Sequence, residues 1–407
     1  MVAAKLHDLS LGYQLLWNAQ RRVAGVLLTL EPEPGKQPDA TQALSALAAL
    51  WNPSGPALII RTASRPLLAD WLVQTPKPGL VLEIASQWLS EPALAQQVLR
   101  APQRGLALAW RGQPGEQALP AFAASFSHHI VSLSAENALA ALRVSLRKLH
   151  GSSHQSGLRS ASPVRAGQIY EGVASRALSE HCLDQQHASA LLGWPTEDVL
   201  YGFRHARIQP DLQAIQGLIS AIGIDAPLEQ IERGLSEEPI LAYRFLRYVN
   251  SAGLALRQEI DSLRQGLMVL GLTRTKNWLH ELLPNACSDP NLQPIRHAMV
   301  LRARFMVQLM DAGQSVALQR ELYLCGLLSQ IDLLLGESMA DALRGLVLPG
   351  RTKEAILSQT GPYWPYLDMA TTLEAADPQA SRTCCARHGF TADDVNLALL
   401  RTLTGEI

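Results

Sequence analysis

Short apolar runs alternate with longer segments of helical spacing along the first half of the chain. The apolar runs are predicted to be β-strands and lie at 12–17, 22–30, 56–60, 79–84, 105–110, 129–133, 167–173 and 188–193. Segments rich in alanine and leucine separate most of them, as at 41–51 and 135–149. A strand followed by a helix, repeated along the chain, predicts a parallel sheet covered by its crossover helices. Eight such strands are enough to close the sheet into a barrel.

The predicted barrel is short. A barrel of eight strand–helix units usually takes about 250 residues, whereas roughly 195 precede the end of the strand pattern here. We therefore expect short loops. The active sites of such barrels are built from the loops that follow the strands, so a reduction of these loops removes activity before it removes the fold.

Helical spacing replaces the strand pattern after Pro195. Ser262 to Gln265 fits a capping box at the start of one predicted helix, and Gly271 is suited to end it. The chain is thus predicted to be α/β followed by all-α. The expected domains are a reduced barrel at 1–195 and a helical domain at 196–407.

The composition indicates folded domains with sizeable cores, because 47% of the residues are apolar and only 17% are charged. A formal net charge of −1 gives no overall attraction to nucleic acid or to anionic membranes. No apolar run reaches the roughly 18 residues that a membrane span requires. Five cysteines, an odd number without framework spacing, are typical of a reducing compartment. We expect a cytoplasmic protein without membrane or nucleic-acid partners.

Three motifs stand out in the first half of the chain: Gly12-Tyr13-Gln14-Leu15-Leu16, Val81-Leu82-Glu83-Ile84 and Tyr170-Glu171-Gly172-Val173. They resemble motifs of EAL domains, the cyclic di-GMP phosphodiesterases. Gly193-Trp194-Pro195 is similar to the end of the closing strand in that family. The resemblance implies a TIM-like barrel of the EAL type. In that family, carboxylates at the strand ends hold divalent metal ions, which activate water for attack on a phosphodiester.

Most of the residues that would hold these metal ions are replaced. By the resemblance, Gln14 stands for the glutamate of the first strand, and Ala109 and Trp110 stand for an adjacent pair of aspartates. Only Glu83 and Glu171 match acidic positions of the family. Two carboxylates leave a divalent ion under-coordinated. We therefore expect no catalysis and no metal or other cofactor, and we interpret Glu83 and Glu171 as surviving acids at the barrel mouth.

A second resemblance lies in the helical half. Three segments resemble the HDOD domain, a branch of the HD hydrolase fold, and they lie at 238–241, 244–252 and 260–271. The parent HD enzymes hold metal with an adjacent His-Asp pair, because imidazole and carboxylate are both good ligands for such ions. Ser329 and Gln330 stand at these two places. His297 matches an upstream ligand position, and we interpret it as a buried or rim histidine that donates one hydrogen bond.

Two further regions are candidates for surface contacts. Arg244 and Arg247 share one face of a predicted helix, and Asn250 ends that helix. This face is either ordinary amphipathic surface or a docking surface for an acidic partner. The stretch 151–166 is rich in serine, glycine and arginine, and is interpreted as a loose excursion within the first domain because strand-like segments follow it.

Together, these patterns favour a non-catalytic bacterial signalling adaptor that contacts protein partners through its HDOD domain. The alternative is a receptor that binds cyclic di-GMP or another nucleotide without hydrolysis, with Arg61, Arg65 and Trp110 near the barrel mouth. A third hypothesis, residual metal-dependent phosphodiesterase activity, requires Glu83 or Glu171 as a ligand.

Overall fold

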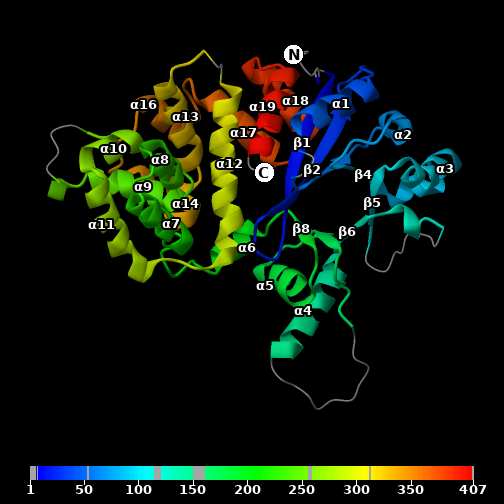
Figure 1. The fold of residues 1–407 in the computed structure, drawn as a ribbon, viewed down its shortest axis with the longest axis horizontal. Helices are drawn as coiled ribbons and strands as arrows, with labels where there is room; N and C mark the ends of the chain where they lie inside the picture. The colour runs from blue at the N-terminus through cyan, green and yellow to red at the C-terminus, as the bar shows by residue number, and fades with distance from the viewer. Residues whose placement is uncertain are drawn as a thin grey trace. The chain divides into compact units, whose positions relative to one another are not determined.

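The computed structural model describes residue 6 and residues 8–52, 55–113, 121–149, 161–254, 259–310 and 313–405 (Figure 1). The chain divides into two compact units. One contains Met1–Asp198 together with Thr372–Ile407, and the other contains Val199–Thr371. Most of the stretch 151–166 lies outside the described residues. Within them, no helix combines the length and the apolar character that crossing a membrane demands.

The first unit is built on a closed barrel whose strands follow one another in chain order. The strands are β1 (Leu9–Trp17), β2 (Val23–Pro32), β3 (Ala57–Arg61), β4 (Leu80–Ala85), β5 (Ala107–Gly112), β6 (His128–Ser132), β7 (Ile169–Glu171) and β8 (Ala190–Leu192). Each of them overlaps one of the predicted apolar runs. The predicted barrel is therefore confirmed.

β1 runs in the opposite direction to the other strands. It pairs antiparallel with β2 and with β8, whereas the remaining neighbours are parallel. The predicted parallel sheet thus needs a correction at β1. In the turn between β1 and β2, Asn18 Oδ1 accepts hydrogen bonds from the backbone N–H groups of Gln20 and Arg22, both at 3.0 Å. A turn of this length reverses the chain and is too short for the crossover that joins parallel strands.

A layer of inward-facing apolar side chains fills the barrel. Its members are Leu16, Leu27, Ile59, Val81, Ala109, Ile130, Ile169, Ala190 and Leu192. Side chains alternate between inside and outside along a strand, so the residues two positions further on also face the interior. On β3 to β7 these positions lie at the carboxyl ends of the strands, where the mouth of such a barrel is formed.

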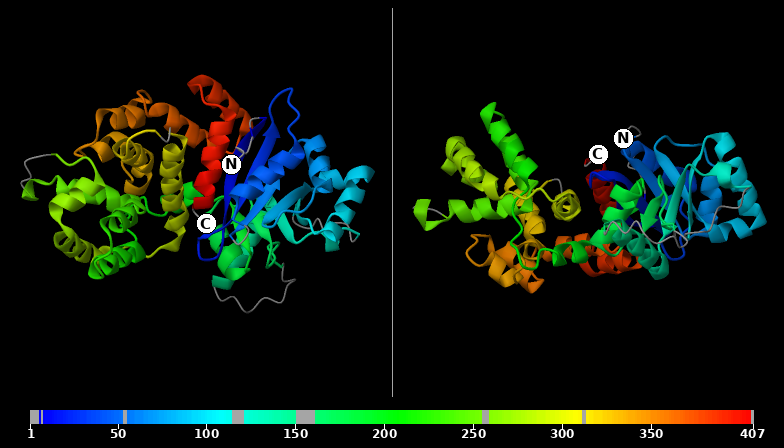
Figure 2. Two further views of the ribbon diagram at one scale, coloured as in Figure 1. Left: turned by 45° about the horizontal axis from the view of Figure 1, so that its top comes forward. Right: turned by 90° about the horizontal axis from the view of Figure 1, so that it is seen from below.

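Helices lie outside the barrel strands (Figure 2). Between the strands the chain forms α1 (Ala40–Leu50), α2 (Arg65–Val73), α3 (Pro92–Arg100), α4 (Ala135–Leu149) and α5 (Arg176–Glu180). Among the described residues between β5 and β6, only Ala123–Ser125 are helical, in a single 3₁₀ turn. In the part that the structure describes, this connection therefore lacks the α-helix of a complete strand–helix unit.

The last two helices of the chain also pack on the barrel. α18 (Pro378–His388) and α19 (Ala392–Gly405), red in Figure 1, lie beside the blue strand β1. Asn396 Nδ2 donates hydrogen bonds to the backbone carbonyl oxygens of Leu6 and Leu9, at 3.0 and 2.7 Å. The sequence assigned these helices to the second domain, because an apolar helix face looks the same whichever unit it covers. The structure places them in the compact unit of the barrel.

The second unit is helical. Its helices are α7 (Leu212–Gly223), α8 (Leu228–Ser236), α9 (Pro239–Val249), α10 (Leu263–Leu270), α11 (Leu272–Leu282), α12 (Gln293–Leu309), α13 (Val316–Leu328), α14 (Ile331–Leu335), α15 (Met339–Leu343) and α16 (Gly350–Lys353). The chain passes between the two units within α6 (Thr196–Tyr201) and α17 (Trp364–Glu374).

α9 and α10 pack closely in the core of the helical unit. An added Cβ at Gly266 of α10 would lie 2.7 Å from the ring of Phe245, which is fully buried on α9. Ser262 Oγ accepts a hydrogen bond from the backbone N–H of Gln265, and Gly271 follows the helix with a φ of 78°. The predicted start and end of this helix are confirmed.

Candidate functional site

Five polar side chains gather where strands β3 to β7 end. Each lies two positions after a residue of the apolar layer, so the alternation along the strand points it into the barrel. We call them the barrel-mouth cluster: Arg61, Glu83, Arg111, Ser132 and Glu171. The cluster contains both acids that the sequence assigned to the barrel mouth and Arg61, which the receptor hypothesis placed near it, and it adds Arg111 and Ser132.

The two arginines bind the two acids directly. Arg61 Nε lies 2.8 Å from both carboxylate oxygens of Glu83, and its Nη2 lies 3.4 Å from Glu171 Oε2. Arg111 donates from Nε and Nη2 to Glu171 Oε1, at 2.9 and 2.7 Å. Ser132 Oγ also donates to Glu171 Oε1. Two guanidinium groups and two carboxylates thus balance one another in charge.

Burial and the opposite charges together set the pKa values of the groups in the cluster. The side chains of Glu83 and Glu171 are 3% and 14% exposed. Burial raises the pKa of Glu83, against the opposing charges of Arg61 and Arg111. Burial also acts to raise the pKa of Glu171, but the hydrogen bond from Ser132 and the charge of Arg111 outweigh it and lower that pKa. Burial acts to lower the pKa of Arg61, but the charges and hydrogen bonds of Glu83 and Glu171 outweigh it and raise that pKa, so the guanidinium stays charged.

The cluster does not fit a pair of divalent metal ions. A metal ion at Glu83 would have to displace Arg61, whose Nε bonds to both carboxylate oxygens. Ala109 lies in the apolar layer, and Trp110 is 2% exposed, so neither supplies a ligand oxygen at the mouth. Gln14 pairs in register with Leu27 of the same apolar layer. It is therefore one layer below the cluster.

Of the three residues considered for nucleotide binding, Arg61 alone belongs to the barrel-mouth cluster. Arg65 forms an exposed ion pair with Glu91, with Nε 2.6 Å from a carboxylate oxygen. The Trp110 ring is buried, with its centroid 6.0 Å from that of His129.

The place of the His-Asp pair in the helical unit also contains an arginine. Ser329 follows α13, and its Oγ donates to the carbonyl oxygen of Gly326 at 2.7 Å. Arg302 of α12, only 3% exposed, donates from Nη1 to Ser329 Oγ at 2.8 Å. Burial raises the pKa of the nearby Asp332, while the charge of Arg302 opposes that shift. A buried guanidinium beside Ser329 does not suit a metal site.

His297 faces another side of α12. It lies five positions before Arg302, which corresponds to about 140° around a helix axis. Burial and the nearby charge of Arg304 lower the pKa of His297 to about 4, so it is neutral near pH 7.

The candidate surface residues lie on α9 and at its end. Arg244 is half-buried and Arg247 is exposed. Asn250 Nδ2 donates to the carbonyl oxygens of Leu246 and Ile260, at 2.8 and 2.7 Å, and its Oδ1 accepts from the Ile260 N–H at 2.9 Å. Asn250 therefore fixes the chain after α9, while a docking role for this face stays a prediction.

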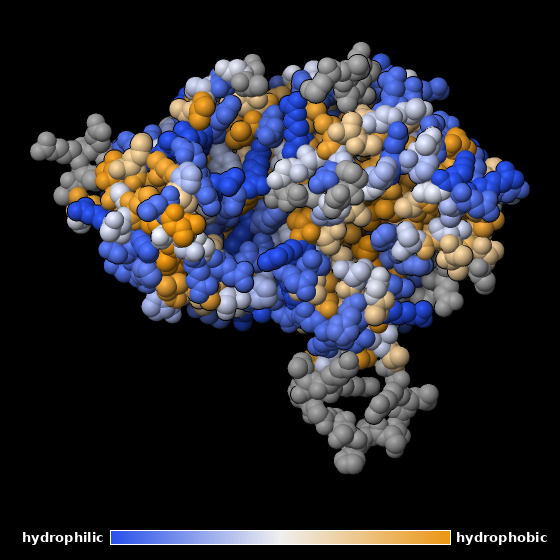
Figure 3. All heavy atoms as spheres, in the orientation of Figure 1, coloured by the Kyte–Doolittle hydropathy of each residue, from blue (hydrophilic) through white to orange (hydrophobic). Residues whose placement is uncertain are grey.

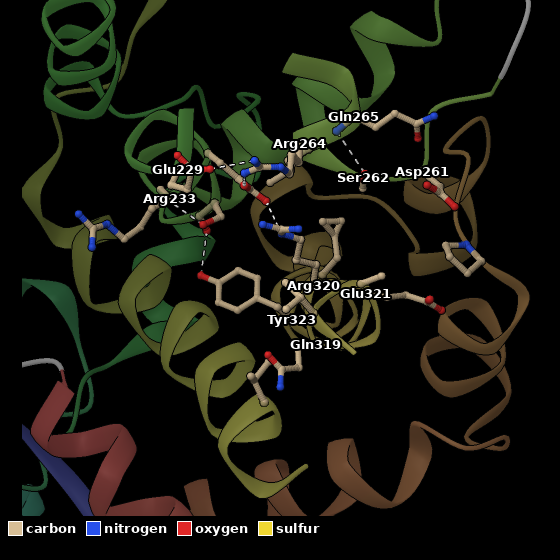
Figure 4. A pocket seen from close by; sticks show the side chains of 18 of the residues that line it. Glu229, Arg233, Asp261, Ser262, Arg264, Gln265, Gln319, Arg320, Glu321 and Tyr323 are labelled. Carbon is tan, nitrogen blue, oxygen red and sulfur yellow. Dashed lines mark hydrogen bonds and ion pairs between the residues drawn. The ribbon is translucent and has the colours of Figure 1, made fainter. Parts of the chain in front are cut away.

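Sequence reasoning missed a cavity of about 530 Å³ between α8, α10 and α13. Along one wall, Arg264 bonds to Glu229 at 2.8 Å and to Glu232 at 3.1 Å, and Arg320 bonds to Glu232 at 2.9 Å. Figure 4 shows Arg264 and Arg320 approaching one another on this wall. Apolar side chains gather over α10 (Figure 3), where Met268 is 60% exposed. The charged side chains on this wall come from segments far apart in the sequence, so no local pattern predicts the cavity.

Comparison with known proteins identifies the helical unit. Residues 212–353 match the HDOD domain model. The chain is 26% identical over 171 residues to the cyclic di-GMP phosphodiesterase CdgJ of Vibrio cholerae, an alignment that covers 42% of this chain and 40% of that protein. It is 28% identical over 150 residues to the uncharacterized protein YuxH of Bacillus subtilis, covering 36% of each. The matched region thus spans less than half the length of these relatives.

Two solved structures are similar to this chain at low identity. The MmoQ response regulator of Methylococcus capsulatus is 16% identical with a TM-score of 0.39, covering 47% of this chain and 97% of that one. The EAL enzyme Bd1971, bound to cAMP and cyclic di-GMP, is 14% identical with a TM-score of 0.30, covering 46% and 61%. The HDOD match lies in the helical unit, and the other unit is built on a closed eight-stranded barrel, so the chain combines a barrel with an HDOD domain.

Proposed function

We propose that this protein is a non-catalytic adaptor in bacterial cyclic di-GMP signalling, acting through protein contacts of its HDOD domain. The similarity to CdgJ, a cyclic di-GMP phosphodiesterase, supports the signalling context. The observation that carries the proposal is the barrel-mouth cluster, in which Arg61 and Arg111 neutralise Glu83 and Glu171.

The chemistry of the arginines supports a barrel without hydrolytic activity. A divalent metal ion activates a bound water by lowering its pKa and polarises the phosphoryl oxygen. A guanidinium group neutralises carboxylates equally well, but it has no open coordination position for water. A metal ion bound at Glu83 would lie close to the positive charge of the displaced Arg61, and the two cations would repel one another. The cluster is therefore suited to holding the barrel mouth together without a cation.

A hydrolysis assay with the full chain tests this proposal. We expect cyclic di-GMP turnover with Mn²⁺ or Mg²⁺ to equal the background measured without protein, and Glu83→Gln to leave it unchanged. Glu91→Gln, which alters an exposed acid of the same unit, is the matched control. Metal-dependent turnover that Glu83→Gln abolishes and Glu91→Gln preserves would contradict the proposal.

A second candidate function is a nucleotide receptor that does not hydrolyse its ligand. One observation favours it: the Arg111 side chain is 35% exposed at the barrel mouth, and arginine binds phosphate oxygens in a bidentate manner. Calorimetry with cyclic di-GMP tests this function. Binding that Arg111→Gln abolishes would support the receptor, whereas flat titrations at high protein concentration would remove it.

A further inference from the structure

Three arginines of the helical unit, Arg207, Arg244 and Arg247, interact through their charges, and none of them is ion-paired to a carboxylate in the part of the chain that the structure describes. Burial lowers the pKa of the half-buried Arg244, and the charges of Arg207 and Arg247 lower it further, against the opposing charge of Glu238. Glu238 is itself buried and forms an ion pair with Arg296, whose Nε lies 3.0 Å from Glu238 Oε1. No carboxylate of the described residues forms an ion pair with Arg207, Arg244 or Arg247. We call these three residues the arginine surface.

Three other arginines of this unit do have such partners. The side chains of Arg264, Arg304 and Arg320 are 27%, 28% and 37% exposed. Each of them lies within 3.1 Å of a glutamate oxygen. The half-buried Arg244 differs from them, because two further arginine charges act on it and no ion pair among the described residues offsets its own. The like charges of the arginine surface repel one another, and this cost is relieved when an anion binds.

One member of the arginine surface, Arg247, is held in place by a buried tyrosine. Arg247 Nη1 lies 3.2 Å from the Tyr243 hydroxyl, and its guanidinium carbon lies 5.7 Å from the centre of the Tyr243 ring. Tyr243 is 3% exposed and donates to the carbonyl oxygen of Ala342 at 2.9 Å. Arg244 and Arg247 are one turn apart on α9, and Asn250 fixes the chain that follows. A side chain ordered in this way loses little freedom when it binds a partner.

We infer that the arginine surface docks an acidic helix of a partner protein. This inference rests on the proposed adaptor function and names the face that the adaptor uses. Glutamates three or four positions apart on a helix are about 5–6 Å apart, which is the separation expected for Arg244 and Arg247. Carboxylates also match the fork of a guanidinium group. The formal net charge of −1 provides no long-range attraction for nucleic acid, which favours a protein as the occupant.

Fluorescence anisotropy with the full chain tests the inference. The probe is a fluorescein-labelled helical peptide with glutamates at i and i+3, and the same peptide with glutamines is its control. We expect Arg244→Gln/Arg247→Gln to weaken binding of the acidic peptide by about tenfold or more. Arg274→Gln, at an exposed arginine of α11, removes a comparable charge elsewhere on the unit and should leave the affinity unchanged. Arg247→Lys, which keeps the charge, should lie between.

Several results would overturn the inference. One is that the unaltered protein does not bind the acidic peptide at low salt. Another is that it binds the glutamine peptide with equal affinity. A third is that Arg274→Gln and the double variant lose equal amounts of affinity for the acidic peptide. Displacement of the peptide by inorganic phosphate or a single-stranded oligonucleotide, with the same dependence on Arg244 and Arg247, would identify a phosphate-binding surface instead. Thermal melts confirm that the variants fold. Metal-dependent hydrolysis that needs Glu83 would refute the proposed function separately, because this binding assay does not involve the barrel mouth.

Discussion

Replacement of Arg61 by methionine leaves Glu83 buried without its main partner. The Glu83 side chain is 3% exposed, and both of its oxygens lie 2.8 Å from Arg61 Nε. The other guanidinium of the cluster, Arg111, lies 3.9 Å from one of these oxygens. Removing one partner of a buried ion pair costs about 3–5 kcal/mol. We expect Arg61→Met to lower the free energy of unfolding of the barrel unit by an amount in this range.

The size of the loss depends on pH through Glu83. Burial already raises the pKa of Glu83, and removing the opposing charge of Arg61 raises it further. A carboxyl group whose pKa is higher in the folded state than in the unfolded state binds its proton more readily when folded. Stability therefore falls as the pH rises through the folded pKa. The destabilisation by Arg61→Met should be largest at neutral pH and should shrink as the pH is lowered.

Urea unfolding followed by circular dichroism measures this loss. The double variant Arg61→Met/Glu83→Met should regain most of the stability, since apolar replacement of a whole buried ion pair is often neutral or stabilising. The matched control is Arg65→Met, which breaks the exposed pair with Glu91 and should cost no more than about 1 kcal/mol. If Arg61→Met also costs less than about 1 kcal/mol, or if the double variant is as unstable as the single one, the cluster does not stabilise the barrel as argued.

Three further predictions concern the helical unit. Gly326→Ala should lower the free energy of unfolding, measured with urea, by about 1–3 kcal/mol, because the new Cβ would lie 2.6 Å from Ala303 Cα. The control is Gly217→Ala on α7, which has open space around it and should be neutral or stabilising. Ser262→Ala removes the hydroxyl that caps α10 and should cost about 1 kcal/mol, whereas Ser262→Asp should retain most of the stability. The pKa of His297 is lowered to about 4 in the folded protein, so the histidine is protonated in the unfolded chain first as the pH falls. The stability of the fold should therefore decrease between the ordinary histidine pKa of about 6.5 and pH 4. An NMR titration that gives an ordinary pKa, or an unchanged pH profile in His297→Gln, would contradict this.

The strand positions follow from local sequence because apolar runs on buried strands differ from the helical spacing between them. Both acids expected at the barrel mouth, Glu83 and Glu171, lie there for the same reason: each stands near the C-terminal end of an apolar strand. The ion pairs that they form with Arg61 and Arg111 do not follow from any local pattern. Both arginines flank Glu83 because β3 and β5 pair with β4 on either side, and Arg61 on β3 reaches Glu171 on β7 because the sheet closes into a barrel.

The direction of β1 and the contact of Arg302 with Ser329 also could not be predicted from local sequence. The pattern at 12–17 predicts a strand without its direction, which depends on whether the following link is a turn or a helix. Arg302 lies in a helix whose spacing predicts only a buried face, and its partner comes from the end of another helix. In both cases the deciding contact joins segments that local periodicity treats separately.

The return of α18 and α19 to the barrel decides how this protein can be divided for experiments. A fragment that stops at residue 195 would lose the amide of Asn396 from the backbone of Leu6 and Leu9, and would leave the outer face of β1 open to solvent. A soluble barrel fragment should instead join 1–198 to 372–405 through a short linker, and the helical unit can be excised as an insertion bounded at both ends. Binding lost in a fragment that stops at residue 195 would therefore report misfolding of the barrel before it reported the location of a partner.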